Sequence, residues 1–516
     1  MLEISKKLFD DYNNKGVLYC HWKSNEHLME GLDGETDLDI LVSKDSKTLS
    51  DKCLSENGFV KAITQFGSIY PNVEEWIGYD EGAGKLIHIH LHYELVTGQK
   101  HQKEYVLPWG ELMLSRRIFD EKTGVYTADP VLELVVLKVR IILKMSIKRR
   151  ILLFFGKKVP YGNSLKRELD YLFAQVSIED VKELIKSLFD EGCNQLLAYF
   201  VGKERYYSDA VKYRRVLMRM LKGGRRYGLF CTLLRTAYFR ICFGLRRIGK
   251  KLTIAQPIYR KRLREKGSLI AFVGADGCGK STVTTDTEKW LTWKLEASRF
   301  YLGSGDHYNP LSKRIMAVIQ KKKNEMLHRK SSSISNDIVF VGGKKESTEE
   351  LKKNTKKVGF VRHVAHVYDA VYQLSIARHC KKTLFKADRY RQKGGIALLD
   401  RYPQMQFEGI NDGPKIAARY ARVHDTVFFR YMAKREYKYF DKICTVKPDV
   451  VIKLYVSPEE SIRRKPDHKY EEVAKKASVV ENLIFQGANV CTISTEQDFE
   501  TEIKLIRSII WGEISK

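Results

Sequence analysis

The spacing of apolar and polar positions changes twice along the chain and divides it into three regions. Residues 1–130 contain short apolar runs, such as Leu38–Val42 and 86–91, separated by turns rich in Gly and Asp, which predicts mixed α/β structure. Residues 131–265 have the spacing of helices, beginning with VLELVVLKVRIILKMSIKRRILLFF. From residue 266 onward a buried strand, LIAFVG, a glycine-rich turn and a helix from near Ser281 predict a parallel-sheet α/β domain extending to residue 516.

Within the third region the pattern predicts further strands at 396–400 and 450–456. Residues 321–359, which lie between the strand LIAFVG and the strand at 396–400, are rich in Lys, Ser, Asn and Glu and have little apolar periodicity. Such a segment lacks the apolar residues needed for a packed core, so we expect a mobile insertion there.

Composition agrees with a globular protein of two to four domains. The chain has 516 residues, of which 43% are hydrophobic and 30% charged. Its nine cysteines form no C-x-x-C pair, which favours the reduced cytoplasm over a disulfide framework. No signal-peptide pattern precedes the first region, and no run of 18 apolar residues predicts a membrane span.

Positive charge is concentrated in one part of the chain. The formal net charge is +28, and residues 214–266 hold 17 Lys and Arg with a single acid, Glu265. Apolar residues at spacings of three and four predict a helix there, with one apolar face and a cationic opposite face. The helix could pack on a neighbour with its basic face solvated, or it could lie on an anionic membrane and place the protein peripherally at the inner membrane. Nucleic acid is a third partner, less favoured because no recognised nucleic-acid module is present.

The strongest chemical signal follows the strand LIAFVG. The segment from Gly274 to Ser281, GADGCGKS, satisfies G-x-x-x-x-G-K-[ST], and the flanking elements are a strand and a helix. Glycines permit a turn whose backbone N–H groups point at phosphate oxygens. The motif predicts that Lys280 reaches the β- and γ-phosphates of a nucleotide and that Ser281 ligates Mg²⁺. The predicted ATP-binding residues are Gly274, Gly277, Cys278, Gly279, Lys280, Ser281 and Thr282, with Asp276 as a further catalytic candidate.

A second set of candidates lies at the ends of later strands. The run IALLDRY ends in Asp400, Arg401 and Tyr402, and ligands of open α/β sheets bind at the carboxyl ends of strands. Asp400 is predicted to hold Mg²⁺ or its water, and Arg401 to bind an acceptor phosphate. Arg463 and Arg464, after the strand at 450–456, are weaker candidates for a phosphate-clamping lid.

Together these motifs resemble the thymidylate kinase branch of the nucleoside monophosphate kinases. FVGADGCGKST, followed about 120 residues later by LLDRY, is similar to the P-loop and strand-end motifs of that family. DRYP followed by NDGP is more similar to a divergent, thymidylate kinase-like subgroup often associated with bacterial surface-polysaccharide genes. For residues 266–516 the resemblance implies a P-loop kinase fold, ATP and Mg²⁺, and transfer of the γ-phosphoryl group to a phosphate or hydroxyl acceptor. The 321–359 insertion departs from the compact kinase pattern, so the acceptor stays open between a nucleoside monophosphate and a sugar or sugar-phosphate.

The first region has its own carboxylate motif. Asp37 and Asp39 form D-x-D on a predicted strand, and alternation places both on one face, where they can hold a divalent metal. The segment HWKSNEHLMEGLDGETDLDILV resembles DNA polymerase beta-type nucleotidyltransferases, with Lys23 and Ser24 in its local signature. That family usually supplies a third carboxylate from a later strand. The candidate strand, LIHIHLHYE, instead offers His88, His90 and His92 on one face, which we expect to be partly exposed polar residues rather than a metal or phosphate site.

The leading hypothesis is a phosphotransferase with a P-loop kinase domain at residues 266–516, a nucleotidyltransferase-like domain at 1–130 and a basic helical connector at 131–265. One alternative is a nucleic-acid end-processing enzyme that combines a kinase with a nucleotidyltransferase, which would explain the charge through phosphate contacts. Another is a non-enzymatic nucleotide-sensing module at the membrane.

Overall fold

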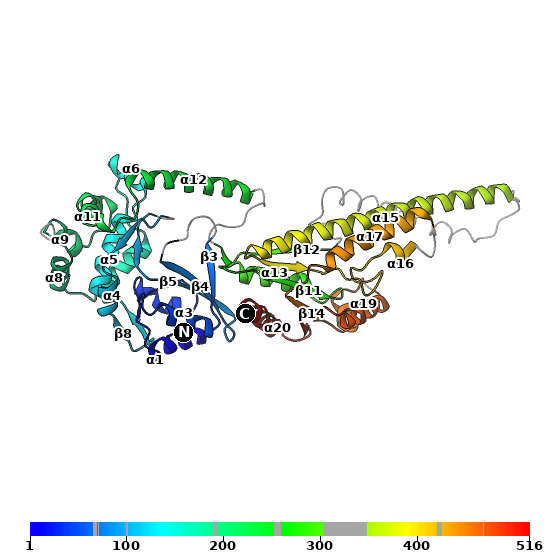
Figure 1. The fold of residues 1–516 in the computed structure, drawn as a ribbon, viewed down its shortest axis with the longest axis horizontal. Coiled ribbons are helices and arrows are strands. Elements are labelled where there is room, and N and C mark those ends of the chain that lie inside the picture. The colour runs from blue at the N-terminus through cyan, green and yellow to red at the C-terminus, as the bar shows by residue number, and fades with distance from the viewer. Residues whose placement is uncertain are drawn as a thin grey trace. The chain divides into compact units, whose positions relative to one another are not determined.

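The computed structural model of the protein describes residues 1–64, 70, 72–99, 102–189, 194–251, 260–303, 348–420, 426–467 and 469–516. These residues form two compact units (Figure 1). The first unit comprises Met1–Arg264, Trp293–Glu296 and Ile514–Lys516, and the second comprises Glu265–Thr292 and Ala297–Glu513.

A mixed sheet forms the centre of the first unit. Among the described residues it has eight strands in the order β10-β3-β4-β5-β2-β1-β9-β8. Their bounds are β1 Tyr19–His21, β2 Leu38–Val42, β3 Val60–Thr64, β4 Val73–Asp80, β5 Lys85–His92, β8 Ile118–Asp120, β9 Val125–Thr127 and β10 Lys261–Leu263. The predicted strands at Leu38–Val42 and 86–91 are confirmed as β2 and β5. A separate hairpin pairs β6 Leu95–Thr97 with β7 Tyr105–Leu107.

Short helices accompany this sheet. They are α1 Glu3–Asn14, α2 Leu28–Leu32, α3 Lys47–Glu56, α4 Gly110–Ser115 and the 3₁₀ turn η1 Asn25–His27. Leu8 and Phe9 of α1 are buried together with Ile40, Ile87 and other strand residues in one core cluster. Burial of these apolar side chains stabilises the sheet and fixes which strand face is turned away from the core.

Helices dominate the chain after residue 130 and belong to the same unit. They are α5 Pro130–Leu143, α6 Ile147–Phe154, α7 Asn163–Phe173, α8 Ile178–Leu188, α9 Asn194–Val201, α10 Tyr207–Val211, α11 Arg214–Met220, the 3₁₀ turn η3 Lys222–Gly224 and α12 Leu229–Lys251. Asp129 is the N-cap of α5, and its carboxylate accepts the N–H of Val131 at 3.0 Å. Pro130 occupies the first turn, a position that favours proline.

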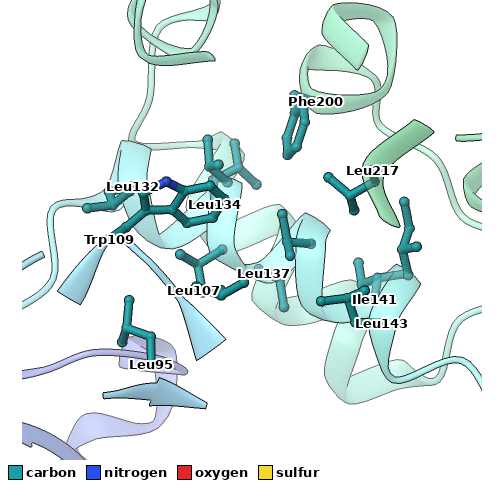
Figure 2. Close-up of a cluster of buried hydrophobic side chains, with 14 of the residues drawn as sticks. Leu95, Leu107, Trp109, Leu132, Leu134, Leu137, Ile141, Leu143, Phe200 and Leu217 are labelled. Atoms are coloured by element: carbon teal, nitrogen blue, oxygen red, sulfur yellow. The ribbon is translucent and has the colours of Figure 1, made fainter. Parts of the chain in front are cut away.

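One hydrophobic cluster joins these helices to the sheet region (Figure 2). Leu132, Leu137 and Ile141 of α5 pack with Leu95 and Leu107 of the hairpin, and helices α9 and α11 contribute Phe200 and Leu217. Helices α5, α9 and α11 of the segment predicted as a connector, 131–265, are therefore packed in one core with residues of the N-terminal region. This arrangement explains why α5 is apolar on almost every side.

The second unit is built on a parallel sheet. Among the described residues it has five strands in the order β12-β13-β11-β14-β15, all paired in parallel. The strands are β11 Leu269–Gly274, β12 Ala297–Tyr301, β13 Ile396–Asp400, β14 Val450–Tyr455 and β15 Asn489–Ser494. The helices are α13 Lys280–Leu291, α15 Thr348–Gln392, α16 Ile416–Tyr420, α17 Val427–Cys444, α18 Pro458–Arg464, α19 Tyr470–Asn482 and α20 Phe499–Ile514. The predicted α/β class with a parallel P-loop-type sheet is confirmed.

The strand register brings the sequence motifs together. Central strand β11 lies between β13 and β14, with Phe272 opposite Asp400 and Gly274 opposite Leu454. The glycine-rich turn after β11 and the Asp400–Arg401 pair after β13 therefore meet at the carboxyl edge of the sheet, where ligands of such folds bind.

Two predicted segments differ from the expectation. Of the insertion predicted at 321–359, residues 321–347 lie outside the described residues, and residues 348–359 have helical backbone at the start of α15. The basic segment does contain the predicted helix, α12, but among the described residues its apolar side chains Leu234, Ile241 and Leu245 are exposed. No helix in the described parts of the chain is long and apolar enough to cross a membrane.

Candidate functional site

The glycine-rich turn has the geometry of a phosphate-binding loop. Gly277 and Gly279 have φ angles of 85° and 81°, a region open mainly to glycine, and Gly279 is the N-cap of α13. A Cβ on Gly274 would come within 2.4 Å of the Cys278 sulfur and 2.7 Å of the Leu454 carbonyl oxygen. The loop therefore depends on glycine at these positions, and the backbone N–H groups of such a turn and the N-terminus of α13 suit an anion.

Lys280 lies across this loop. Its Nζ donates hydrogen bonds to the carbonyl oxygens of Gly274 at 2.9 Å and Ala275 at 2.6 Å. The side chain is largely buried. A buried ammonium group held by carbonyl oxygens is positioned to exchange those partners for phosphate oxygens.

Ser281 and Asp400 form the oxygen-rich part of the site. Ser281 begins α13, Asp400 ends β13, and the Ser281 hydroxyl donates to Asp400 Oδ2 at 3.5 Å. Hydroxyl and carboxylate oxygens are the donors that Mg²⁺ prefers. The residues predicted as magnesium ligands in this unit are thus brought together by the β11–β13 pairing.

Arg401 is held in an unusual backbone conformation beside Asp276. Its φ of 78° is rare for a residue with a side chain, and such strain is common at functional sites. The guanidinium lies 3.3 Å from Asp412 and 3.6 Å from Asp276. The neighbouring Asp412 carboxylate raises the pKa of Arg401, so Arg401 stays charged.

Neighbouring cations keep the side chain of Asp276 ionised. Lys476 Nζ donates to Asp276 Oδ2 at 2.7 Å. Partial burial opposes ionisation, but the hydrogen bond and charge of Lys476, with Arg401 and Lys280, lower the pKa of Asp276 to about 2. Asp276 therefore links the glycine-rich turn to α19, an element far away in sequence.

A cavity of about 330 Å³ opens beside the glycine-rich turn, and we call it the basic cavity. The described residues that line it include more cations than acids. The cations are Lys280, Arg401, Lys415, Arg419, Lys475 and Lys476, and the acids are Asp276, Asp412 and Glu472. Tyr402 also lines it, although its hydroxyl donates to the Val446 carbonyl oxygen at 2.7 Å. This lining suits a small anionic ligand.

The lid prediction differs from the structure. Arg463 and Arg464 are on α18, where both pair with Glu460, and Arg464 also donates to the Thr495 carbonyl oxygen at 2.7 Å. Neither lines the basic cavity. Its late-sequence cations are instead Lys475 and Lys476 of α19. The sequence offered no signal that separates them from other charged helix positions, because only the return of α19 to the sheet edge brings them there.

Buried polar side chains fix the loop between β13 and α16. Gln404 donates to the carbonyl oxygens of Phe407 at 2.8 Å and Ile410 at 2.9 Å. Glu436 of α17 accepts the N–H groups of Lys415 at 3.1 Å and Ile416 at 2.8 Å, and burial raises its pKa. These contacts position the stretch that supplies Asp412 and Lys415 to the cavity.

The first unit carries a second cluster around Asp37 and Asp39. Strand β2 pairs in parallel with β5, which places Asp39 opposite His90. His88 Nδ1 lies 2.8 Å from Asp37 Oδ1, and His92 Nε2 lies 3.1 Å from Asp39 Oδ1. The three histidines therefore face the two aspartates on one surface of the sheet, as the alternation predicted.

The expectation of partly exposed polar histidines is wrong for His88 and His92. His88 and His92 are buried and His90 is mostly covered, because all three pair with carboxylates. A third carboxylate reaches the same histidines: Glu75 of the next strand, β4, whose Oε2 lies 2.7 Å from His88 and 3.0 Å from His90. The sequence pattern pointed to the histidine strand for a third carboxylate. Glu75 lies on a different strand, and the antiparallel β4–β5 pairing brings it opposite His90.

Lysines balance these carboxylates. Lys23 Nζ lies 2.7 Å from Asp39, Lys261 lies 2.8 Å from Glu75, and Lys294 pairs with Asp37. Burial opposes the charge of Asp39, but Lys23 and the histidines hold its pKa well below the usual range. Lys23 thus lies in the cluster, whereas the Ser24 hydroxyl donates to Glu168 at 3.1 Å.

The donor atoms of this cluster lie close enough together to hold a metal ion. One atom each from Asp37, His88 and His90 lie within 4.8 Å of one another, and the same holds for Asp39, His90 and His92. Mixed imidazole and carboxylate donors suit Zn²⁺ or Mn²⁺ better than Mg²⁺, which favours oxygen.

Comparison with known proteins gives relatives for part of the chain. An uncharacterized ATP-binding protein, YghR of Escherichia coli strain K12, is 29% identical over 234 residues, which cover 45% of this chain and 82% of that protein. A second such protein of that strain, YghS, is 28% identical over 227 residues, covering 43% of this chain and 83% of its own length. No family model matches the chain.

Among solved structures, a deoxyadenosine kinase from M. mycoides with bound dATP aligns with a TM-score of 0.27 and 16% identity, covering 47% of this chain and 98% of that one. The assignment of the second unit to the P-loop fold rests on its own strand order, its glycine-rich turn and the positions of Lys280, Ser281 and Asp400.

Proposed function

We propose that the second unit is an ATP- and Mg²⁺-dependent phosphotransferase that moves the γ-phosphoryl group of ATP to a phosphate-bearing acceptor. The main observation behind this proposal is that the glycine-rich turn and the basic cavity lie next to each other at the carboxyl edge of the parallel sheet. The glycine-rich turn with Lys280 and Ser281 lies on one side, and the basic cavity with Arg401 and Lys476 opens beside it. The ATP-binding relatives support the nucleotide part.

Each named side chain has a physical task in this reaction. Lys280 and the loop N–H groups would bind the β- and γ-phosphates, and Ser281 and Asp400 would hold Mg²⁺, which supplies charge neutralisation at the phosphates. Arg401 would bind the acceptor and the transferred group from the other side. Because phosphoryl transfer needs positioning and charge neutralisation more than covalent chemistry, a rigid cationic site is sufficient to promote it.

The charge and volume of the basic cavity indicate the chemical class of the acceptor. The excess of cations in the basic cavity favours a ligand that already carries phosphate, such as a nucleoside monophosphate or a sugar-phosphate, over a neutral sugar. The cavity volume of about 330 Å³ suits a molecule of this size. A role in surface-polysaccharide metabolism rests on the thymidylate kinase-like resemblance of the DRYP and NDGP motifs alone.

A transfer screen tests this proposal. The full chain is incubated with γ-labelled ATP, Mg²⁺ and, in separate reactions, nucleoside monophosphates, neutral sugars, sugar-phosphates and 5′-hydroxyl oligonucleotides. We expect labelled product with a small phosphorylated acceptor. Labelling of oligonucleotides alone would favour the end-processing alternative, and no labelling despite ATP binding would favour a nucleotide sensor; either result would contradict the proposal.

A second candidate function belongs to the first unit. The convergence of Asp37, Asp39 and Glu75 on the same histidines supports a metal-dependent nucleotide site of the nucleotidyltransferase type. Lys23, beside Asp39, would contact the phosphates of a nucleoside triphosphate, and His88 and His90 would share the metal with the aspartates. Departure from the three-aspartate pattern leads us to expect Mn²⁺ or Zn²⁺ in preference to Mg²⁺.

Titration calorimetry with Mn²⁺, Zn²⁺ and Mg²⁺ tests this site independently of activity. We expect Asp39→Asn to weaken Mn²⁺ or Zn²⁺ binding about tenfold or more, because it removes a ligand charge. Asp10→Asn, at an exposed position of α1 in the same unit, is the control. Equal metal binding by wild type and Asp39→Asn would exclude a metal role for the cluster.

A further inference from the structure

The described side chains of helix α12 contact the rest of the first unit through one face. Thr232 and Phe239 are 7% and 6% exposed. Gln102, on the segment before β7, donates to the Thr232 carbonyl oxygen at 3.2 Å and also to the Thr236 hydroxyl. Arg225 donates to the Thr232 hydroxyl at 3.2 Å. The face that carries Thr232, Thr236 and Phe239 is thus the inward face.

The opposite face is apolar and exposed. Seven large apolar side chains of α12 are 55–72% exposed: Phe230, Leu233, Leu234, Tyr238, Ile241, Leu245 and Ile248. At 100° per residue they fall within an arc of about 140° centred roughly opposite Phe239. A surface helix normally turns such an arc toward the core, so α12 has the reverse orientation. The predicted cations, Arg235 and Arg240 among them, lie outside the arc, on the side that also carries the inward contacts of Thr232 and Phe239.

Cations border the exposed arc. Arg235 and Arg240 lie on its two sides at the helical spacing, and α12 has no acidic residue. Arg235 stacks over Tyr227 at 4.5 Å, which holds its guanidinium beside the helix. The surrounding sequence, residues 214–266, has a net charge of +16. An apolar arc edged by arginines matches the layered chemistry of a membrane surface, with acyl chains beneath anionic headgroups.

A second exposed apolar point occurs on α6 of the same unit. Phe154 is 85% exposed, and Phe155 and Ile151 are also exposed. Basic residues surround them in sequence: Lys148, Arg149, Arg150, Lys157 and Lys158. Exposed apolar side chains next to Lys and Arg therefore occur on α6 as well as on α12. Exposed apolar patches of this kind mark interaction surfaces.

We propose that the outward face of α12, together with the end of α6, docks the protein on the surface of an anionic lipid bilayer. The apolar arc enters the headgroup boundary, and Arg235 and Arg240 contact anionic headgroups. Lipid fits better than nucleic acid because five of the seven outward side chains are aliphatic and offer no stacking surface to bases. This proposal is independent of the reaction assigned to the second unit.

Vesicle flotation with the full chain tests the proposal. The probes are vesicles of phosphatidylcholine alone and of phosphatidylcholine with 30% phosphatidylglycerol. We expect flotation with the anionic vesicles, weakening as salt is raised. The variant Leu234→Gln/Ile241→Gln/Leu245→Gln should bind about tenfold less or weaker still, because it removes apolar area that enters the bilayer. Arg235→Gln/Arg240→Gln should reduce binding to anionic vesicles and leave the weaker binding to neutral ones unchanged.

The matched control replaces exposed apolar residues elsewhere, Ile178→Gln/Val427→Gln/Leu505→Gln, and should float like wild type. Because the substituted apolar side chains are exposed, we expect the two triple variants to keep the wild-type circular dichroism and thermal transitions, which would rule out misfolding. Equal flotation of the α12 variant and wild type would overturn the proposal. Filter binding to RNA and sedimentation of the full chain test the other partners. If the α12 variant lost RNA binding or a dimer but still floated like wild type, the face would belong to that partner and the proposal would be overturned.

Discussion

At the scale of single residues, Lys280 connects the glycine-rich turn to the chemistry proposed for it. Its ammonium group bonds to loop carbonyls that a nucleotide phosphate would replace. We expect Lys280→Ala to lower phosphoryl transfer about 100-fold or more while the fold survives, because a preorganised charge at the phosphates is lost. Initial rates with labelled ATP measure this effect.

The control for that substitution is Lys289→Ala. Lys289 is exposed on the same helix, α13, and does not line the basic cavity. It removes the same charge at nearly the same place in the sequence, so its rate should equal that of wild type. Wild-type turnover by Lys280→Ala would contradict the assignment of the turn as a catalytic phosphate site.

Glu133 of α5 supplies a prediction about pH. It is buried and accepts hydrogen bonds from Asn25, and burial raises its pKa to about 7 from an ordinary value near 4.5. Between these values the folded state binds more protons than the unfolded state, so this residue makes stability fall as pH rises from about 4.5 through 7. Glu133→Gln removes this dependence.

The measurable quantity is the difference in Tm between Glu133→Gln and wild type. It should shift in favour of the variant between pH 5 and pH 8, by the equivalent of up to about 3 kcal/mol. Glu3→Gln, at an exposed position, should give a difference that does not change with pH. A flat difference for Glu133→Gln would mean that this carboxyl ionises normally.

At the scale of elements, the loop between β13 and α16 is the part of the second unit most dependent on side-chain hydrogen bonds. Gln404 joins the backbone at Phe407 and Ile410, and the loop carries Asp412 and Lys415 to the basic cavity. We expect Gln404→Ala to raise the acceptor KM about tenfold with little change in the ATP KM, because each lost buried bond costs about 1 kcal/mol of loop order.

Steady-state kinetics with both substrates varied separate these constants. Gln392→Ala, an exposed glutamine at the end of α15, is the matched control and should leave both KM values unchanged. A larger rise in the ATP KM than in the acceptor KM would show that the loop serves the nucleotide and would exchange the roles given to the two sides of the cavity.

At the scale of the whole molecule, the chain has separate hydrophobic cores in its two compact units. Separate cores predict separate unfolding transitions. A ligand that binds only one native unit raises only that transition, by about 2.7 kcal/mol at a hundredfold excess over Kd. We therefore expect ATP with Mg²⁺ to raise one of two calorimetric transitions by a few degrees.

Lys280→Ala provides the control for this experiment as well, because it should abolish the shift without removing either transition. Mn²⁺ without nucleotide should raise the other transition if the cluster of Asp37, Asp39 and the histidines binds it. An equal rise of both transitions with ATP would contradict a nucleotide site confined to the second unit.

Sequence reasoning found the parts of the sites that are contiguous in the chain. The glycine-rich turn, the DRY strand end and the D-x-D strand each combine residue type, spacing and flanking apolar runs within about ten residues. Their local structure follows from those residues: glycine permits positive φ, and alternation places Asp37 and Asp39 on one face. The α/β class and the strands β2, β11 and β13 were predictable for the same reason.

Only the tertiary structure decided which distant residues complete the sites. Strand pairing brings Glu75 to His88 and His90, which pair with Asp37 and Asp39 on the other side. Lys476 reaches Asp276 because α19 returns to the sheet edge. The outward direction of the apolar arc of α12 was likewise hidden, since helical periodicity gives the arc but not the side on which Thr232 and Phe239 attach. Periodicity and motif spacing are local properties, whereas strand order and helix docking depend on burying apolar surface across the whole chain, and that balance is settled only by the complete fold.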